Sequence, residues 1–408
     1  MVSRGRAALL FGLFLWAACS PPSGVGPVAG SRGRSERPLP GGAALVRLGS
    51  GLPDLSGALE TDRASLLEAL ERSLTWFERP SSREYFPVSG ITHVRAWASV
   101  YALRELLGQI EDPAEFAVEI RRQFDFYMSR GSDGRGTVLF TGYYAPVFEG
   151  SLTASDEHRY PLYRLPDDLV VDEATGETRG RRVGNRIVPY PTRAQLETSH
   201  MPTGFELVWL RDRFQAYLVH VQGSAAIRLP DGSVMNIGYA GNNGHQYVSV
   251  ALELVADGVL REDELSLDVV RAYFDAHPDE LEPYLHRNPR FVFFREEGGS
   301  DWPTGSLGVK VTPLRSIAAD KRVLPPGGVV LITTRAAGAR GSAGRLERLV
   351  LDQDSGGAIR SPGRADIYFG IGPEAEEAAG RMHAEGRMYY LFLKPERVAE
   401  WRARGGLD

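Results

Sequence analysis

Apolar residues recur every three or four positions in two stretches near the start of the chain. The first stretch runs from Thr61 to Arg79 and the second from Ile91 to Arg130. This spacing puts one apolar stripe along a helix, so we predict that both stretches are helical and pack as a cap. The stripes consist of Leu66, Leu67, Leu70, Leu74 and Phe77 in the first stretch and of Trp97, Val100, Leu103, Leu106 and Leu107 in the second.

After Gly136 the pattern changes to short apolar runs separated by glycine, proline and aspartate, which is typical of strands. These runs predict a barrel or a tightly curved sheet. Two of them are joined by Pro230-Asp231-Gly232-Ser233, which favours a hairpin turn. The runs predicted as strands are VLFTGYYAPVF, YPLYRL, FELVWLRD, FQAYLVHVQGSAAIRL and VMNIGYAG.

Helical spacing returns between Tyr247 and His286, with breaks predicted at Asp257-Gly258 and His277-Pro278. From Phe291 to the end, glycine or proline occurs at nearly every turn and we predict mainly strands. The segment between Leu331 and Leu349, which contains TTRAAGARGSAGRLER, is predicted to be a variable surface loop.

The composition is that of an ordinary folded protein. The 408 residues suffice for two domains with separate cores, and 43% of them are hydrophobic and 24% charged. The formal net charge of -5 does not favour binding to a polyanion, so we expect no nucleic-acid partner.

The N-terminus has the pattern of an export signal. Two arginines precede an apolar run from Ala7 to Ala18, which is too short to span a membrane and ends at Cys19. The sequence WAAC resembles the bacterial lipobox, although Trp16 stands where leucine is usual. We predict that residues 1–19 are a lipoprotein signal peptide ending at the lipidated Cys19. The alternative is a plain signal peptide cut nearby.

Cys19 is the only cysteine, so no intramolecular disulfide can form. Residues 20–53 are rich in proline, glycine, serine and arginine and nearly free of aromatic residues. Such a segment buries too little apolar surface to offset the entropy lost on ordering. It therefore predicts a flexible tether behind the lipid anchor.

Common catalytic motifs are missing from the sequence. It contains no HExxH or CxxC metal motif, no glycine-rich phosphate loop and no GxSxG nucleophile motif. Carboxylates remain, and three aspartates stand among small residues in the last quarter: Asp320, Asp354 and Asp366. Asp354 precedes Gly356-Gly357, where the backbone can approach a ligand closely. Alternatively, each aspartate only caps a turn, a position that this residue type favours.

The three aspartates belong to a series of motifs that resembles a known family. SIAADKRVLPPG, DSGGAIRSPGRADIYFG and GIGPEAEEAAG resemble the 3D domain, which is named for three aspartates. FTGYYAP, YPLYRLP, HVQGS, GYAGNNGHQY, NPRFVFF and GVKVTPLRS resemble the other motifs of membrane-bound lytic murein transglycosylase A, MltA. The resemblance runs in the same order from Thr137 to Lys394. Two departures are Ala225 and Ser361, which stand where the family usually has glycine.

The resemblance implies a mainly β fold with helices, in which a double-psi β-barrel domain carries an inserted second β-barrel-like domain. The main domain would combine residues 54–145 with 302–397, including a 3D region at about 310–394. The inserted domain would span residues 146–301. A groove between the two domains would hold the glycan strand, and no cofactor is implied.

For activity the resemblance implies a peptidoglycan lytic exotransglycosylase, a lyase. Such enzymes cleave the β-1,4 bond between N-acetylmuramic acid (MurNAc) and N-acetylglucosamine (GlcNAc) without water and leave a 1,6-anhydroMurNAc end. Asp366 matches the family's catalytic acid and base, and Asp354 and Asp320 match its companion aspartates. Saccharide contacts, with barrel packing as the alternative, are expected from Thr141, Tyr143, Tyr144, Gln222, Ser224, Asn243 and His245.

Two other functions remain open on the sequence: a peptidoglycan-binding lipoprotein without activity, and a glycosidase that admits water. We expect a monomer that is lipid-anchored at the periplasmic face of the outer membrane and contacts the glycan strands of peptidoglycan. Ser20, which follows the cysteine, differs from the aspartate that signals retention in the inner membrane.

Overall fold

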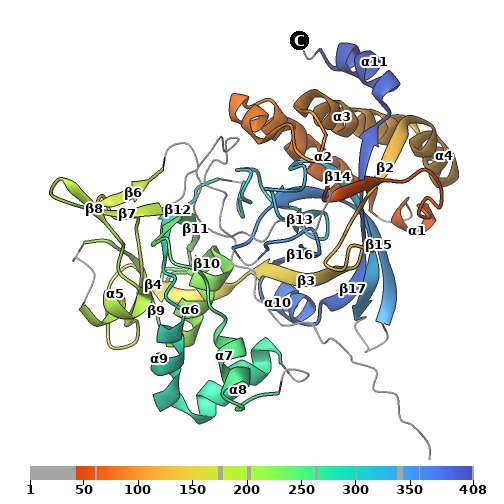
Figure 1. The fold of residues 1–408 in the computed structure, drawn as a ribbon. Helices are drawn as coiled ribbons and strands as arrows, with labels where there is room; N and C mark the ends of the chain where they lie inside the picture. The colour runs from red at the N-terminus through yellow and green to blue at the C-terminus, as the bar shows by residue number, and fades with distance from the viewer. Residues whose placement is uncertain are drawn as a thin grey trace, which may run out of the picture.

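The computed structural model describes residues 43–59, 62–172, 178–199, 204–261, 265–299, 301–337, 343–357 and 359–406. Two large β-sheets dominate it, with helices packed against both (Figure 1). Cys19, the predicted signal peptide and most of the predicted tether lie outside the described residues. The end of the predicted tether is not flexible, because Leu45–Arg47 form the strand β1, which pairs with β2 (Phe124–Ser129) and buries Leu45. None of the helices within the described ranges is long and apolar enough to cross a membrane.

Six strands of the first sheet close into a barrel in the order β17-β14-β15-β13-β16-β3. The ring closes because β3 pairs with β16 on one side and with β17 on the other. This confirms the predicted class, a mainly β fold with helices built on a barrel. The strands are β3 (Val138–Ala145), β13 (Ser316–Ala318), β14 (Val329–Ala337), β15 (Ala343–Asp354), β16 (Arg364–Ile371) and β17 (His383–Leu393), and β2 (Phe124–Ser129) and β1 (Leu45–Arg47) extend the sheet beyond β17.

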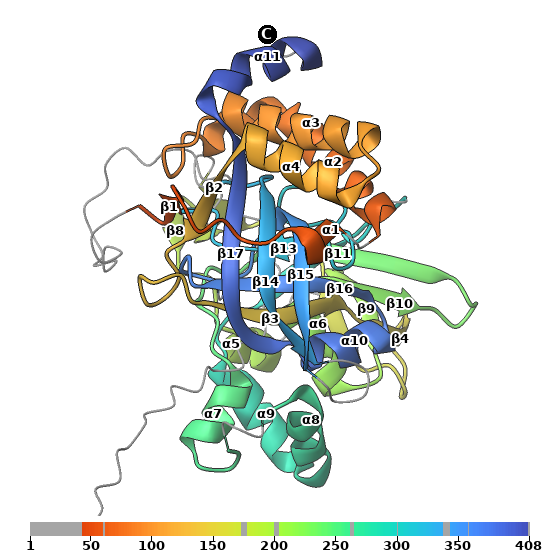
Figure 2. The same ribbon diagram turned by 90° about the vertical axis from the view of Figure 1, so that its right-hand side faces the viewer.

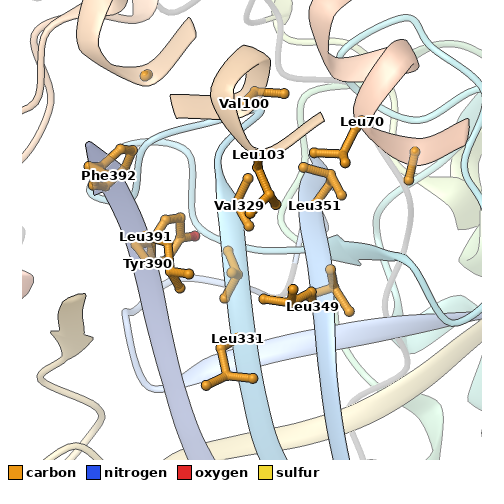
Figure 3. Close-up of a cluster of buried hydrophobic side chains, with 14 of the residues drawn as sticks. Leu70, Val100, Leu103, Val329, Leu331, Leu349, Leu351, Tyr390, Leu391 and Phe392 are labelled. Carbon is orange, nitrogen blue, oxygen red and sulfur yellow. The ribbon is translucent and has the colours of Figure 1, made fainter. Parts of the chain in front are cut away.

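Helices from the first part of the chain cover one end of the barrel, as the predicted cap requires (Figure 2). Leu70, Val100 and Leu103 of these helices reach the barrel residue Leu351 in one buried cluster (Figure 3). Leu67, in contrast to the rest of its predicted stripe, is exposed. The helices are α1 (Ser56–Leu59), α2 (Arg63–Phe77), the 3-10 helix η1 (Pro80–Tyr85), α3 (His93–Gln109) and α4 (Pro113–Gln123), joined by the C-terminal α11 (Pro395–Gly405).

The stretch from Ile91 to Arg130 is not a single helix, so this prediction was wrong in part. Asp112 begins α4 by accepting a hydrogen bond from the Glu115 backbone N–H at 2.7 Å. Pro113 follows at the first helical position, where its fixed φ suits a helix start. The last residues of the stretch form β2, because pairing with β17 outweighs the helical spacing of its side chains.

The second sheet has the order β12-β11-β10-β4-β9-β5, and a bridge between Arg164 and Phe294 links its edges. A small sheet, β6-β7-β8, lies at the end of the molecule away from the cap (Figure 1). The pairing of β10 with β11 confirms the predicted hairpin. The strands are β4 (Val147–Ser151), β5 (Tyr160–Tyr163), β6 (Leu169–Val171), β7 (Thr178–Val183), β8 (Arg186–Val188), β9 (Glu206–Leu210), β10 (Ala225–Arg228), β11 (Val234–Asn242) and β12 (Val292–Glu296).

The remaining helices agree with the predicted breaks. α7 and α8 end where breaks were predicted, with Asp257 and His277 as their C-caps. Strands predominate after Phe291, as predicted, with α10 and α11 between or after them. The helices are α5 (Arg193–Ser199), α6 (Arg213–Gln222), α7 (Val250–Ala256), α8 (Leu267–Ala276), α9 (Pro278–Arg287) and α10 (Pro373–Gly380).

The run FQAYLVHV, predicted as a strand, is part of the helix α6. Asp212 caps its start by accepting a hydrogen bond from the Gln215 backbone N–H at 2.7 Å. Gly223 ends it with a φ of 79°, a conformation that favours glycine. Nearly all of the helix is buried, so its apolar run is almost continuous. Such a run does not distinguish a buried helix from a buried strand.

The segment between Leu331 and Leu349, predicted as a surface loop, belongs largely to the paired strands β14 and β15. Pairing with β17 further fixes β14 as a strand. Residues 338–342 lie outside the described part. Arg335 and Arg345, near the outer ends of the two strands, are exposed, which explains why the composition resembles that of a surface loop.

A buried ion pair connects β15 with the turn after β13. Lys321 Nζ contacts Asp352 Oδ1, and the Tyr390 hydroxyl donates to Asp352 Oδ2 at 2.7 Å. All three side chains are buried. Burial raises the pKa of Asp352 and lowers that of Lys321, because water stabilises neither charge there. Loss of one partner therefore leaves the other charge uncompensated.

Lys321→Met should lower the free energy of unfolding by about 3–5 kcal/mol, the usual cost of leaving a buried charge unpaired. The double variant Lys321→Met/Asp352→Leu removes both charges and should recover most of that loss. Urea unfolding followed by circular dichroism measures both variants. A double variant as unstable as the single one would contradict this account of the pair.

Candidate functional site

Four neighbouring strands bring two of the predicted aspartates into one row. Asp354, the last residue of β15, pairs with Ala318 of β13. Ala318 also pairs with Asp366 of β16, which in turn pairs with Thr141 of β3. Neighbouring strands lie roughly 4.8 Å apart, so the Cα atoms of Asp354 and Asp366 are separated by about 10 Å.

A bulge in β15 sets the position of Asp354. Gln353 is an extra residue between the two pairs that β15 makes with the end of β13. Its buried side chain donates a hydrogen bond to the Ala69 carbonyl of α2 at 2.7 Å and accepts one from the Ser316 hydroxyl at 2.6 Å. Because the bulge shifts the register by one residue, Asp354 instead of Gln353 lies opposite Ala318.

Asp366 is fully buried, and two side chains hold its carboxylate. The Thr141 hydroxyl donates to Oδ1, and the Arg364 guanidinium donates to the same oxygen from Nε at 3.1 Å. Among the described residues, Oδ2 accepts one longer contact, from Nη2 of Arg364 at 3.5 Å. The two oxygens therefore differ, since Oδ1 accepts two good hydrogen bonds and Oδ2 keeps most of its capacity for another partner.

Arg364 is a site residue that the sequence analysis missed. It lies two positions before Asp366 on β16, and residues at this spacing share one face of a strand. Its guanidinium also donates to Thr141 Oγ1 at 3.3 Å, so the three side chains contact one another. A search for charged residues two positions from each candidate aspartate would have found it.

Backbone donors hold Asp354. Its Oδ1 accepts hydrogen bonds from the backbone N–H groups of Ser306 and Ser355, each at 2.8 Å. The loop approaches this closely because residue 305 is glycine. A Cβ on Gly305 would lie only 2.8 Å from the Gln353 carbonyl oxygen and 3.3 Å from Cγ of Asp354. These contacts fix the orientation of the Asp354 carboxylate.

Asp320 lies two residues beyond Ala318, outside the row. Its Oδ1 accepts hydrogen bonds from the Arg322 backbone N–H at 3.1 Å and from Arg322 Nε at 2.9 Å, and its Oδ2 accepts one from Arg322 Nη2 at 2.7 Å. Bonds of this kind are typical of an aspartate that closes a turn, the alternative considered from the sequence. The structure does not bring its carboxylate into hydrogen-bond contact with Asp366 among the described residues.

A cavity of about 130 Å³ lies where the barrel meets the second sheet. Four predicted site residues line it: Asp354, Tyr143, Tyr144 and Ser224. Burial raises the pKa of Tyr144, so its hydroxyl stays protonated and can donate a hydrogen bond. Further lining residues, which were not predicted from the sequence, include Tyr239, Arg295, Glu297, Ser306 and Tyr368.

Thr141 and Asp366 do not line this cavity within the described structure, but they lie next to residues that do. Tyr143 follows Thr141 by two residues on β3, and Tyr368 follows Asp366 by two residues on β16. The two tyrosine rings have centroids 5.2 Å apart. Asp366 therefore lies two residues along β16 from a residue that lines the cavity.

Three predicted saccharide contacts lie elsewhere. Gln222 is buried at the end of α6, and its Oε1 accepts no hydrogen bond from the described residues. Asn243 uses its amide N–H groups on two proline carbonyls, at 2.8 and 2.9 Å, and so holds a loop together. His245 donates from Nε2 to the Tyr190 carbonyl at 2.8 Å and lines a second cavity. Tyr239, near the start of the motif that contains Asn243 and His245, lines the first cavity, but Asn243 and His245 do not.

Within the described residues, Glu197, Glu282 and His286 are close enough together to hold a metal ion. Glu197, however, pairs with Arg193 at 2.9 Å and also with Arg213. Arg213 further pairs with Glu282 at 3.1 Å. The guanidinium groups already neutralise the carboxylates, so this cluster is an ion-pair network and a poor cation site.

Family models match two parts of the chain. A model described as the MltA specific insert domain matches residues 139–295, and a 3D domain model matches residues 315–392. Among curated proteins, the chain is 33% identical over 280 residues to membrane-bound lytic murein transglycosylase A of Escherichia coli (strain K12), covering 67% of this chain and 71% of the relative. It is 29% identical over 342 residues to the protein of the same name from Vibrio cholerae, covering 82% and 86%.

Solved structures of the same kind resemble the fold. A membrane-bound lytic murein transglycosylase from Agrobacterium tumefaciens has a TM-score of 0.70 at 27% identity, covering 84% of this chain and 96% of that one. Escherichia coli MltA with bound chitohexaose has a TM-score of 0.68 at 26% identity, covering 89% and 98%. The similarity therefore extends over both sheets.

Proposed function

Because the chain belongs to the family of membrane-bound lytic murein transglycosylase A, which makes it a peptidoglycan lytic transglycosylase, we propose that Asp366 is its single catalytic acid and base. The family and the enzyme class predicted from the sequence are confirmed. The proposal rests on the different hydrogen bonds that the two carboxylate oxygens of Asp366 accept. Thr141 and Arg364 occupy Oδ1 and leave Oδ2 to hold and transfer a proton.

In the proposed reaction, Asp366 Oδ2 gives its proton to the glycosidic oxygen while the bond from that oxygen to C1 of MurNAc breaks. GlcNAc leaves with a hydroxyl at C4. The C6 oxygen of MurNAc bonds to C1, and the C6 hydroxyl proton returns to Oδ2. Atoms and charges balance without water. A nucleophile within the same sugar has a large effective molarity, so a second catalytic carboxylate is not required.

The sugar reaches Asp366 from the first cavity in this proposal. Asp366 has no exposed surface, so side chains that line the cavity, such as Tyr143 and Tyr368, must move when the glycan binds. We assign Asp354 to holding the sugar, because its fixed carboxylate lines the cavity. Asp320 instead holds the turn after β13 through its bonds to Arg322.

The proposed domain division follows the change of sheets. β3 belongs to the barrel and ends at Ala145, and β4 begins the second sheet at Val147. We assign residues 54–145 and 302–397 to the main domain, together with β1 and the end of α11, which belong to the same sheet and core, and residues 146–301 to the inserted domain. Peptidoglycan glycan strands would bind where the two meet.

Membrane association is supported by the names of the relatives, which are called membrane-bound. We propose that the anchor is a lipid on Cys19 and that the tether lets a monomeric enzyme reach the wall from the periplasmic face of the outer membrane.

Asp366→Asn should lower the release of anhydromuropeptides from purified peptidoglycan by about a hundredfold to ten-thousandfold, the contribution usual for a general acid. Mass spectrometry of the released products measures it. Asp231→Asn is the matched control, because it makes the same change at an exposed turn and should leave release intact. Full activity in Asp366→Asn would contradict the proposal, and products with ordinary reducing ends would indicate a hydrolase.

Arg364→Gln should lower kcat by about tenfold to a hundredfold with little change in KM, because it removes charge-assisted bonds that orient the acid and does not touch the sugar. Steady-state rates on peptidoglycan and a circular-dichroism melt measure activity and folding separately. Arg364→Lys keeps the charge but not the guanidinium geometry, so its kcat should lie between that of the parent enzyme and that of Arg364→Gln. An unchanged kcat in a folded Arg364→Gln variant would argue against this positioning role.

Cys19→Ser in the full-length chain should move the protein from the membrane fraction to the soluble fraction, because the serine cannot carry the lipid chains. Fractionation followed by immunoblotting measures this, and mass spectrometry of the parent protein identifies the attached lipid. Retention of the variant in the membrane fraction would overturn the proposed anchor.

A further inference from the structure

The second cavity has a volume of about 910 Å³ and shares no lining residue with the first. This volume falls in the range of about 300–1,000 Å³ that is usual for ligand sites. Proline residues, Tyr190 and Phe205 form its apolar walls. Its polar lining includes Asp167, Asp168, Arg181, Gln195, Thr198 and His245.

Arg181 is the cation of this cavity. Its Nε atom is buried and has no hydrogen-bond acceptor among the described residues. Arg179, on the same strand, differs because it pairs with Asp172. Arg182 is exposed and points to the other face of β7, since successive side chains of a strand alternate. The Arg181 side chain as a whole is half-buried, lines the cavity and forms no ion pair with a described residue, so its guanidinium favours a ligand with a carboxylate.

Two carboxylates line the same cavity. Asp168 accepts a hydrogen bond from the Tyr190 hydroxyl at 3.0 Å, which fixes its position. Asp167 is exposed at the rim. The cavity thus combines one cation with two anions and apolar walls, which suits a peptide that carries both carboxylates and an ammonium group.

The two cavities are lined by residues of one stretch of chain, β11 and the residues just after it. Tyr239 lines the first cavity and His245 the second, and six residues of extended chain span at most roughly 20 Å. Thr178, at the start of β7, donates to the Asn242 carbonyl at 2.8 Å, so the strand that carries Arg181 is fixed to β11. A four-residue extended peptide reaches about 13 Å, and the sugar to which it is joined adds to that length.

We propose that the second cavity binds the stem peptide of MurNAc while the glycan occupies the first cavity, an inference that rests on the proposed function. Arg181 pairs with a carboxylate of the peptide. Asp167 and Asp168 receive the ammonium group of its diamino acid. The enzyme therefore distinguishes peptide-bearing glycan from glycan without peptides.

The test compares two substrates: peptidoglycan that carries its stem peptides and the same material stripped of peptides by an amidase. Anhydro product release gives kcat/KM for each. Arg181→Gln should lower the ratio of the two kcat/KM values, peptide-bearing over stripped, by about tenfold, the effect of one charge-assisted hydrogen bond. Arg182→Gln is the matched control, since it removes the same charge from the next position of β7 outside the cavity, and should leave the ratio unchanged.

If Arg181→Gln leaves the ratio of the two kcat/KM values unchanged, the proposal is overturned. An equal loss on both substrates would also overturn it, because the cavity would then bind sugar and not peptide. If the parent enzyme releases no anhydro product from either substrate, the proposed function fails instead, and the two failures are distinct.

Titration calorimetry measures peptide binding to the second cavity directly, without catalysis. The probe is the free stem tetrapeptide with a diamino acid at its third position, titrated into the parent protein and both variants. Binding that weakens about tenfold in Arg181→Gln and not in Arg182→Gln supports the site. Absence of binding, or equal binding by all three proteins, would rule it out.

Discussion

The pairing of β3 with both β16 and β17 is the constraint on which the rest of the structure depends. It closes the barrel, and its register sets Thr141 opposite Asp366. The same strand lines the first cavity through its two tyrosines and then continues into the second sheet. Gly142 permits this arrangement, because a Cβ there would lie only 2.6 Å from Cα of Ala379 in the helix α10. One strand therefore holds the donor to the proposed acid and also sets the second sheet against the barrel.

Two pairs of buried charges of opposite sign lie in the barrel. Lys321 lies against Asp352, and Arg364 lies against Asp366. An isolated charge in such surroundings would be strongly unfavourable, so each pair depends on the register that brings its members together. At Asp366 the partner groups also have a chemical effect, because Thr141 and Arg364 bond mainly to Oδ1 and leave Oδ2 with only a longer contact. Stability and the proposed proton transfer thus rest on the same contacts.

Patterns along the sequence predicted the features that depend on local spacing. The capping helix α2, the hairpin between β10 and β11 and the breaks among α7, α8 and α9 were predicted correctly, whereas only part of the second capping stretch is helical. Features that depend on pairing between distant segments were not. The buried helix α6 has the apolar run of a strand, and β14 and β15 have the composition of a loop at their outer ends. The bulge at Gln353, the contact of Arg364 with Thr141 and the distance of His245 from the first cavity all follow from register, which residue spacing alone does not encode.

A single acid with a nucleophile inside the sugar means that solvent oxygen never enters the product. Digestion of purified peptidoglycan in water enriched in the heavy oxygen isotope, followed by mass spectrometry of the released fragments, tests this directly. We predict unlabelled fragments that end in 1,6-anhydroMurNAc and are one water lighter than hydrolysis products. Fragments with reducing ends that carry the heavy isotope would contradict the account, because they would require an activated water and a second catalytic group.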